Sequence, residues 1–118
     1  MLSFMAIKVE QDLSDSVPLS AKDALAFMQS TPTLIIIDVR MHNDFVLDHL
    51  EGALNIPLNE LGTSEELKQV PKNKPLLIVC NDGMQSSYAA SVLKHSHNYE
   101  KVFYLYDGLE ALHEPLES

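Results

Sequence analysis

The sequence predicts an α/β domain with a central parallel sheet of four or five strands and helices on both faces. Three short apolar runs, at residues 34–37, 76–79 and 102–105, are the clearest strands. Uninterrupted apolar runs are typical of strands buried on both faces of a parallel sheet. Segments with helix-start signals separate these runs. Strands that alternate with helices in this way are characteristic of parallel α/β folds.

The first half of the chain begins with a polar connector at residues 10–16. A variant capping box, Ser20 to Asp23, then begins a helix, and Thr31-Pro32 ends it. After the strand at 34–37, we expect a short helix near 43–48. A second short strand is expected at 53–56, where Pro57 closes it.

The second half opens with another capping box, Thr63 to Glu66, at the start of a short helix. The strand at 76–79 leads to a helix at 86–95, the strand at 102–105 and a final helical turn at 108–113. Residues 1–16 are expected to be an N-terminal segment, either loose or an edge strand, and residues 17–118 to be the domain. Three methionines are expected to fill gaps in the packing, namely Met28, Met41 and Met84, and Met84 is alternatively expected to form an apolar wall of the loop after residue 80.

Composition restricts the classes of partner and the compartment. The chain has 118 residues, enough for one domain with its own core. The net charge of −9 and the lack of a basic stretch argue against nucleic acid and anionic membrane surfaces as partners. Cys80 is the one cysteine, and neither a membrane-spanning run nor a secretory leader is evident. We therefore expect a reducing, cytoplasmic location.

Cys80 follows the predicted strand at 76–79, where a Gly-containing loop leads into a helix. Sites in open parallel sheets lie beyond the carboxyl ends of the strands. Such a loop turns backbone N–H groups toward the cysteine, and the helix adds the positive end of its dipole. Both effects favour a thiolate, so Cys80 is expected to be an accessible nucleophile that can hold an anionic adduct such as a persulfide. The plain alternative is a small buried apolar residue.

Several motifs together resemble the rhodanese family over most of the chain. The family has Asp-Val-Arg after its first core strand, matched here by residues 38–40. A His-hydrophobic-x-Gly-Ala-x-Asn-hydrophobic-Pro run is matched by 49–57. The active loop, Cys-x-x-Gly-x-Arg-Ser, is matched by 80–86 at all but one defined position. A hydrophobic strand that runs into a Gly-containing turn, at 102–108, completes the rhodanese-like pattern.

The resemblance implies a rhodanese-type sulfurtransferase or persulfide carrier, with no cofactor and no metal. Cys80 would take sulfur from a donor such as thiosulfate and pass it to cyanide, a thiol or a protein. Partners would be a small sulfur compound and, as a further option, a protein sulfur donor or acceptor. Asp38 and Arg40 would support the site through hydrogen bonds and ion pairs. The substrate-binding residues would be those of the loop: Asn81, Asp82, Gly83, Met84, Gln85 and Ser86.

Three departures from the family pattern keep alternatives open. Gln85 replaces the loop arginine, Asp82 adds an acid to the loop, and Asp107 replaces the first glycine of the closing Gly-Gly. The first two disfavour an anionic donor and support an alternative, a rhodanese-like binding or regulatory module with little or no turnover. A phosphatase or arsenate reductase is a remote option, because the family's phosphatase relatives have a loop one residue longer that carries an arginine.

Overall fold

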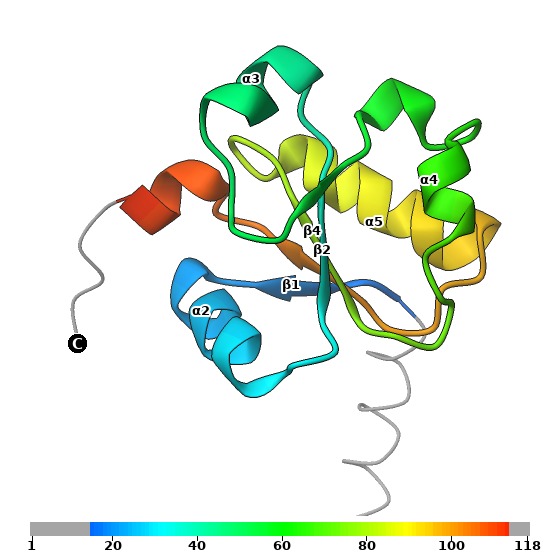
Figure 1. The fold of residues 1–118 in the computed structure, drawn as a ribbon. Helices are drawn as coiled ribbons and strands as arrows, with labels where there is room; N and C mark the ends of the chain where they lie inside the picture. The colour runs from blue at the N-terminus through cyan, green and yellow to red at the C-terminus, as the bar shows by residue number, and fades with distance from the viewer. Residues whose placement is uncertain (1–14, 114–118) are drawn as a thin grey trace, which may run out of the picture.

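The computed structural model describes residues 15–113, and a five-stranded parallel sheet forms its centre (Figure 1). The strands are β1 (Val17–Leu19), β2 (Ile35–Asp38), β3 (Leu54–Asn55), β4 (Leu76–Val79) and β5 (Val102–Leu105). Their order is β1-β5-β4-β2-β3, and every neighbouring pair is parallel. The predicted parallel sheet is confirmed. The strand that leads into Cys80 is therefore the central one, with a neighbour on each side.

Within residues 15–113, four α-helices and one 3-10 helix lie between the strands, and a second 3-10 helix follows β5. They are α2 (Ala21–Ser30), α3 (His42–Leu47), α4 (Glu65–Lys68), α5 (Met84–Ser96), η1 (Leu58–Glu60) and η2 (Leu109–His113). The Ser20 hydroxyl accepts a hydrogen bond from the Asp23 amide at 3.1 Å, so the predicted start of α2 is confirmed. The cap of α4 is Ser64 rather than Thr63, because the Ser64 hydroxyl accepts from the Leu67 amide at 3.1 Å.

The core lies in two layers, one on each face of the sheet. Leu76, Ile78 and Cys80 pack into the layer beneath α4 and α5. Leu77 and Val79 point to the other face, where α2 and η2 cover them. This alternation is the two-residue period of a strand. The expected helices on both faces of the sheet are confirmed. Figure 1 shows α4 and α5 on one side of the sheet and α2 on the other.

The edge strand β1 was not predicted from the sequence. An edge strand within residues 1–16 was expected as one option, but all of these residues except 15 and 16 lie outside the described part of the chain. The observed edge strand begins at Val17 and pairs with β5. Pro18 sits in its centre, and a proline without an N–H is compatible with an edge strand. No helix in residues 15–113 is long and apolar enough to cross a membrane.

Candidate active site

The segments that follow β2, β4 and β5 meet at the carboxyl edge of the sheet. The amide of Val39 donates to the carbonyl of Val79 at 3.0 Å, which joins the first two segments. The amide of Leu109 donates to the carbonyl of Cys80 at 2.8 Å, which joins the second to the third. The active loop, defined as residues 80–86, is therefore held by backbone contacts from the segment after β5, and the residue directly before it is held by the segment after β2.

The sulfur of Cys80 sits inside this loop. Its Sγ accepts hydrogen bonds from the backbone amides of Gly83 and Ser86, both at 3.2 Å. Gly83 has a φ of 93° and is the N-cap of α5, so the chain turns sharply around the sulfur as the helix begins. Amide donors and a helix N-terminus both stabilise a negatively charged sulfur over a neutral one. The loop is thus suited to hold a thiolate or the terminal anion of a persulfide.

Cys80 is more buried than expected. The residue is only 1% exposed and packs in the same core layer as α5. The expectation of an accessible thiol is therefore wrong for this conformation, because the loop closes over the sulfur. A sulfur donor can reach Sγ only by a narrow approach or after the loop shifts.

Two glycines allow the active loop to pack against the turn that follows β5. A Cβ on Gly83 would lie 2.0 Å from the carbonyl oxygen of Tyr106. A Cβ on Gly108 would lie 2.1 Å from the carbonyl oxygen of Asn81. The Ser86 hydroxyl adds hydrogen bonds to the carbonyls of Gly83 at 3.0 Å and Leu105 at 3.4 Å. The shape of the loop around the sulfur therefore depends on the turn after β5.

Gly108→Ala is expected to destabilise the domain and disturb the active loop. Gly108 has a φ of 83°, which costs an alanine about 1–2 kcal/mol, and the backbone overlap adds about 1–3 kcal/mol. Gly52→Ala is the matched control, because Gly52 has a φ of 81° but nothing within 4 Å of its Cβ position. Gly62→Ala controls for the substitution itself, since Gly62 has neither feature. Chemical denaturation measures the stability of all three variants. An equal loss of stability in Gly108→Ala and Gly52→Ala would show that the backbone overlap at Gly108 has no effect.

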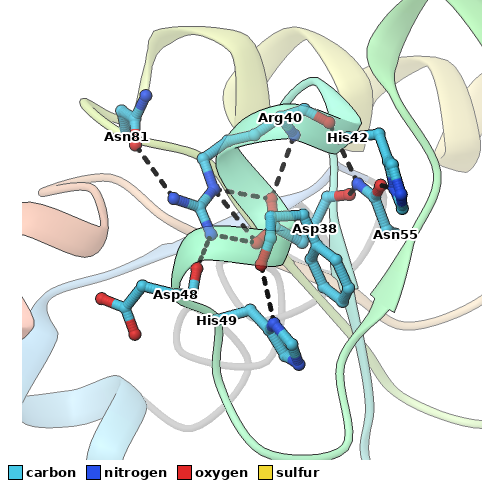
Figure 2. Close-up of polar contacts among 8 residues, drawn as sticks. Asp38, Arg40, His42, Asp48, His49, Asn55 and Asn81 are labelled. Atoms are coloured by element: carbon cyan, nitrogen blue, oxygen red, sulfur yellow. Dashed lines mark hydrogen bonds and ion pairs between the residues drawn. The ribbon is translucent and has the colours of Figure 1, made fainter.

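A buried ion pair lies behind the active loop (Figure 2). The carboxylate of Asp38 is fully buried and accepts from the guanidinium of Arg40, with a shortest distance of 2.8 Å. The guanidinium also donates to Asn81 Oδ1 at 3.3 Å and to the carbonyl of Asp48 at 2.6 Å. Asn55 Nδ2 donates to the carbonyls of Asp38 and Arg40, both at 3.0 Å. The network connects the end of β2 to the first loop residue after Cys80.

The guanidinium of Arg40 stays protonated at ordinary pH. The hydrogen bond to Asp38 raises the pKa of Arg40 above its already high usual value, although burial acts in the opposite direction. Arg40 is therefore a permanent cation, and it forms an ion pair with Asp38. It supplies no free positive charge to an anionic substrate at the active loop.

The remaining loop side chains have different surroundings. Asp82 Oδ1 accepts from the Met84 amide at 3.1 Å, so this amide at the start of α5 is already occupied. Gln85 is exposed and uncharged. Met84 and Met41 are also exposed, which contradicts their expected role as core fillers, because both follow strand ends that no helix covers. Met28 does pack against the core, as expected.

A neutral groove beside the loop contains site residues that the sequence did not identify. It has a volume of about 460 Å³ and is lined by Val39, Met41, Leu58, Asn59, Gln85 and Tyr88. The spacing of Gln85 and Tyr88 could have revealed one wall of the groove, since residues three apart share a helix face.

Asp107, outside this groove, stands where the family pattern has the first glycine of the closing Gly-Gly. Its Oδ2 accepts from the Ala21 amide at 3.1 Å and so fixes the start of α2.

Comparisons with known proteins agree with this geometry. The family model for the rhodanese-like domain matches residues 20–115. The tRNA uridine(34) hydroxylase of Enterobacter sp. (strain 638) is 30% identical over 86 residues, which are 70% of this chain and 24% of that protein. The same enzyme from Escherichia fergusonii is 29% identical over the same shares. The chain thus spans about a quarter of the length of these curated relatives.

Solved structures share the fold. Reduced Bacillus anthracis CoADR-RHD is 29% identical with a TM-score of 0.67, and the match covers 82% of this chain and 16% of that one. The human single-domain sulfurtransferase TSTD1 is 18% identical with a TM-score of 0.74, covering 86% and 99% of the two chains. The second likeness concerns the fold alone. With the family match, the sheet order and the loop around Cys80, the chain belongs to the rhodanese-like domain family.

Proposed function

We propose that this domain takes up a sulfur atom on Cys80 and passes it on, as a sulfurtransferase or persulfide carrier. The observation that carries the proposal is the pair of backbone amides, from Gly83 and Ser86, directed at Sγ. Such donors stabilise the thiolate before the reaction and the leaving thiolate after it. Membership of the rhodanese-like family supports the same chemistry. Cys80 has no second cysteine in the sequence to pair with, which is compatible with a reducing compartment, so the proposal places the domain in the cytoplasm.

The proposed reaction consists of two displacements. In the first, the Cys80 thiolate attacks the outer sulfur of a donor, the donor's sulfur–sulfur bond breaks, and sulfite or a thiolate leaves. In the second, an acceptor thiolate attacks the outer sulfur of the Cys80 persulfide, and Cys80 leaves as a thiolate. Each step exchanges one sulfur–sulfur bond for another, so no external oxidant or reductant is needed.

The charges around the loop favour a donor other than thiosulfate. Gln85 offers no positive charge, Asp82 adds a negative one, and Arg40 is committed to Asp38. A dianion would approach a thiolate and a carboxylate with no free cation on the loop to offset them. We propose that the donor is uncharged or protein-bound.

A binding or regulatory module with little turnover is the second candidate. The burial of Cys80 favours it, because a cysteine residue that is 1% exposed is poorly placed to meet a substrate. The two candidates differ in one observable property. A transferase or carrier must form a persulfide and lose it again, whereas a binding module need not.

Sulfur uptake on Cys80 tests the proposal. After incubation with a donor of no net charge, cysteine persulfide, or with an excess of polysulfide as a stronger donor, and after removal of the reagent, intact-mass analysis is expected to show a gain of one sulfur atom per chain. Cys80→Ser is expected to show none, because the hydroxyl is not a nucleophile of comparable strength. Proteolysis after blocking with an alkylating reagent should place the sulfur on the Cys80 peptide. If neither polysulfide nor a cysteine-derived donor gives this gain, the binding-module function replaces the proposed one.

A further inference from the structure

The large apolar side chains that are exposed gather at the edge of the sheet that holds the active loop. Within residues 15–113 they all follow strand ends at the carboxyl edge: Met41, Val46, Leu47, Met84, Tyr88 and Tyr106. Leu47 on α3 is 83% exposed, and Met84 at the start of α5 is 76% exposed. We call these six residues the apolar rim. Exposed apolar side chains gathered at one edge of a domain are typical of interaction sites.

The apolar rim borders the neutral groove beside the loop. Met41 and Tyr88 belong to both, and Gln85 connects the groove to the active loop. None of the residues that line the groove is charged. The groove therefore suits an uncharged side chain of a partner bound beside the active loop, and it offers no charged group to hold an anion.

The two edges of the sheet differ in their lysines rather than in their acids, since Glu65, Glu66 and Glu100 lie toward the amino edge and the arginine of the carboxyl edge is paired with Asp38. Five of the six lysines among the described residues lie toward the amino edge, in α4, before β4 and β5, or at the end of α5: Lys68, Lys72, Lys74, Lys94 and Lys101. The carboxyl edge carries exposed acids on α3, on the active loop and after β5: Asp44, Asp48, Asp82, Asp107 and Glu110. Its lysine, Lys22, is followed directly by Asp23. The edge with Cys80 is therefore apolar at its rim and acidic around it.

We propose that this edge docks a protein that presents its reactive cysteine beside apolar residues and between lysines or arginines. The inference rests on the proposed function and names the partner that exchanges sulfur with Cys80. The apolar neighbours would occupy the groove and the rim, and the basic flanks would meet the acids. Complementary charge of this kind steers encounter and raises the association rate. Nucleic acid is disfavoured because its phosphates would meet the same acids.

The extent of the apolar rim favours a protein over a small thiol. The rim includes α3, the start of α5 and the turn after β5, so it extends across the segments that follow three strands. A small thiol would contact only the active loop. In the proposed transfer, the partner's thiolate attacks the outer sulfur of the Cys80 persulfide. The partner then carries the persulfide, and Cys80 returns to the thiolate that Gly83 and Ser86 stabilise.

Synthetic peptides test this inference on the full chain loaded with polysulfide. One peptide has a cysteine between leucines with lysine flanks, a second has glutamate flanks, and a third has lysine flanks with glycines in place of the leucines. Intact mass follows the loss of sulfur from Cys80 at a pH where histidine is neutral. We expect the leucine–lysine peptide to react on the order of tenfold faster than the glutamate peptide at low salt. This difference should shrink at high salt, and the glycine peptide should be slower.

Two variants test whether the apolar rim itself determines the rate of transfer to the peptide. Tyr88→Ser should slow discharge to the leucine–lysine peptide several-fold more than discharge to 2-mercaptoethanol, because it removes rim and groove surface. Ser91→Ala, one turn further along α5 and outside the rim, should leave the peptide's rate unchanged. Equal rates for all peptides and for 2-mercaptoethanol would overturn the docking inference and indicate a small thiol as acceptor. A chain that never loads sulfur would instead overturn the proposed function.

Discussion

Gln85→Arg is expected to strengthen the apparent binding of thiosulfate by about fivefold to several-hundredfold. The reason is electrostatic. Thiosulfate is a dianion, and Gln85 lies on the active loop where the family pattern has an arginine. One added unit charge near a partly exposed site contributes about 1–4 kcal/mol, depending on the effective dielectric constant. Initial rates of thiosulfate turnover at increasing concentration measure the change.

The charge of Asp82 provides an independent test of the same effect. Asp82→Asn removes the negative charge but keeps a side-chain oxygen that can accept from the Met84 amide. It should therefore strengthen thiosulfate binding without altering the start of α5. For both variants the gain should shrink as salt rises, because salt screens exposed charges. Ordinary micromolar affinity in the unmodified protein, or no gain in either variant, would show that loop charge does not determine donor choice.

Arg40→Met is expected to reduce the free energy of unfolding by about 3–5 kcal/mol. The carboxylate of Asp38 is fully buried, and the Arg40 guanidinium is the cation paired with it. Removal of the arginine leaves a buried charge with only the Arg40 backbone amide as donor, at 3.0 Å. The same change frees Asn81, so persulfide on Cys80 should also become shorter-lived. Chemical denaturation and the decay of the loaded mass measure the two effects.

Two further variants separate these effects. Asn81→Ala removes only the link from the guanidinium to the loop, so it should shorten persulfide lifetime with little loss of stability. Asp38→Asn combined with Arg40→Met removes both charges and should recover part of the lost stability. If Arg40→Met lowers the free energy of unfolding by less than Asn81→Ala does, then the buried ion pair does not stabilise this edge of the sheet as described.

The fold was largely predictable because its strongest signals are local. The runs at 76–79 and 102–105 became β4 and β5 with those limits, since central strands of a parallel sheet are apolar on both faces. The limits of α5 were less certain. This helix begins at Met84 rather than Ser86 because Gly83 adopts a left-handed conformation that the residue type permits but does not require. The strand β1 has three residues and a proline, too little pattern to identify.

The candidate site was predictable in position but not in detail. The place of Cys80 at a strand end follows from the sequence. Its burial does not, because that depends on Gly108 packing against the loop from a distant part of the chain. The exposure of Met41 and Met84 was missed for the opposite reason: apolar residue type indicates the core, and only the arrangement of the helices shows which strand ends remain uncovered.

A single-turnover experiment tests the central claim most directly. The chain loaded with one sulfur atom is mixed with an excess of a thiol acceptor, and both products are followed by mass over time. We expect the Cys80 persulfide to disappear at the same rate as persulfide appears on the acceptor, with one sulfur transferred per chain. A loaded chain that retains its sulfur in the presence of the acceptor would contradict the account, and so would an acceptor that gains sulfur equally fast from Cys80→Ser taken through the same loading and removal of reagent.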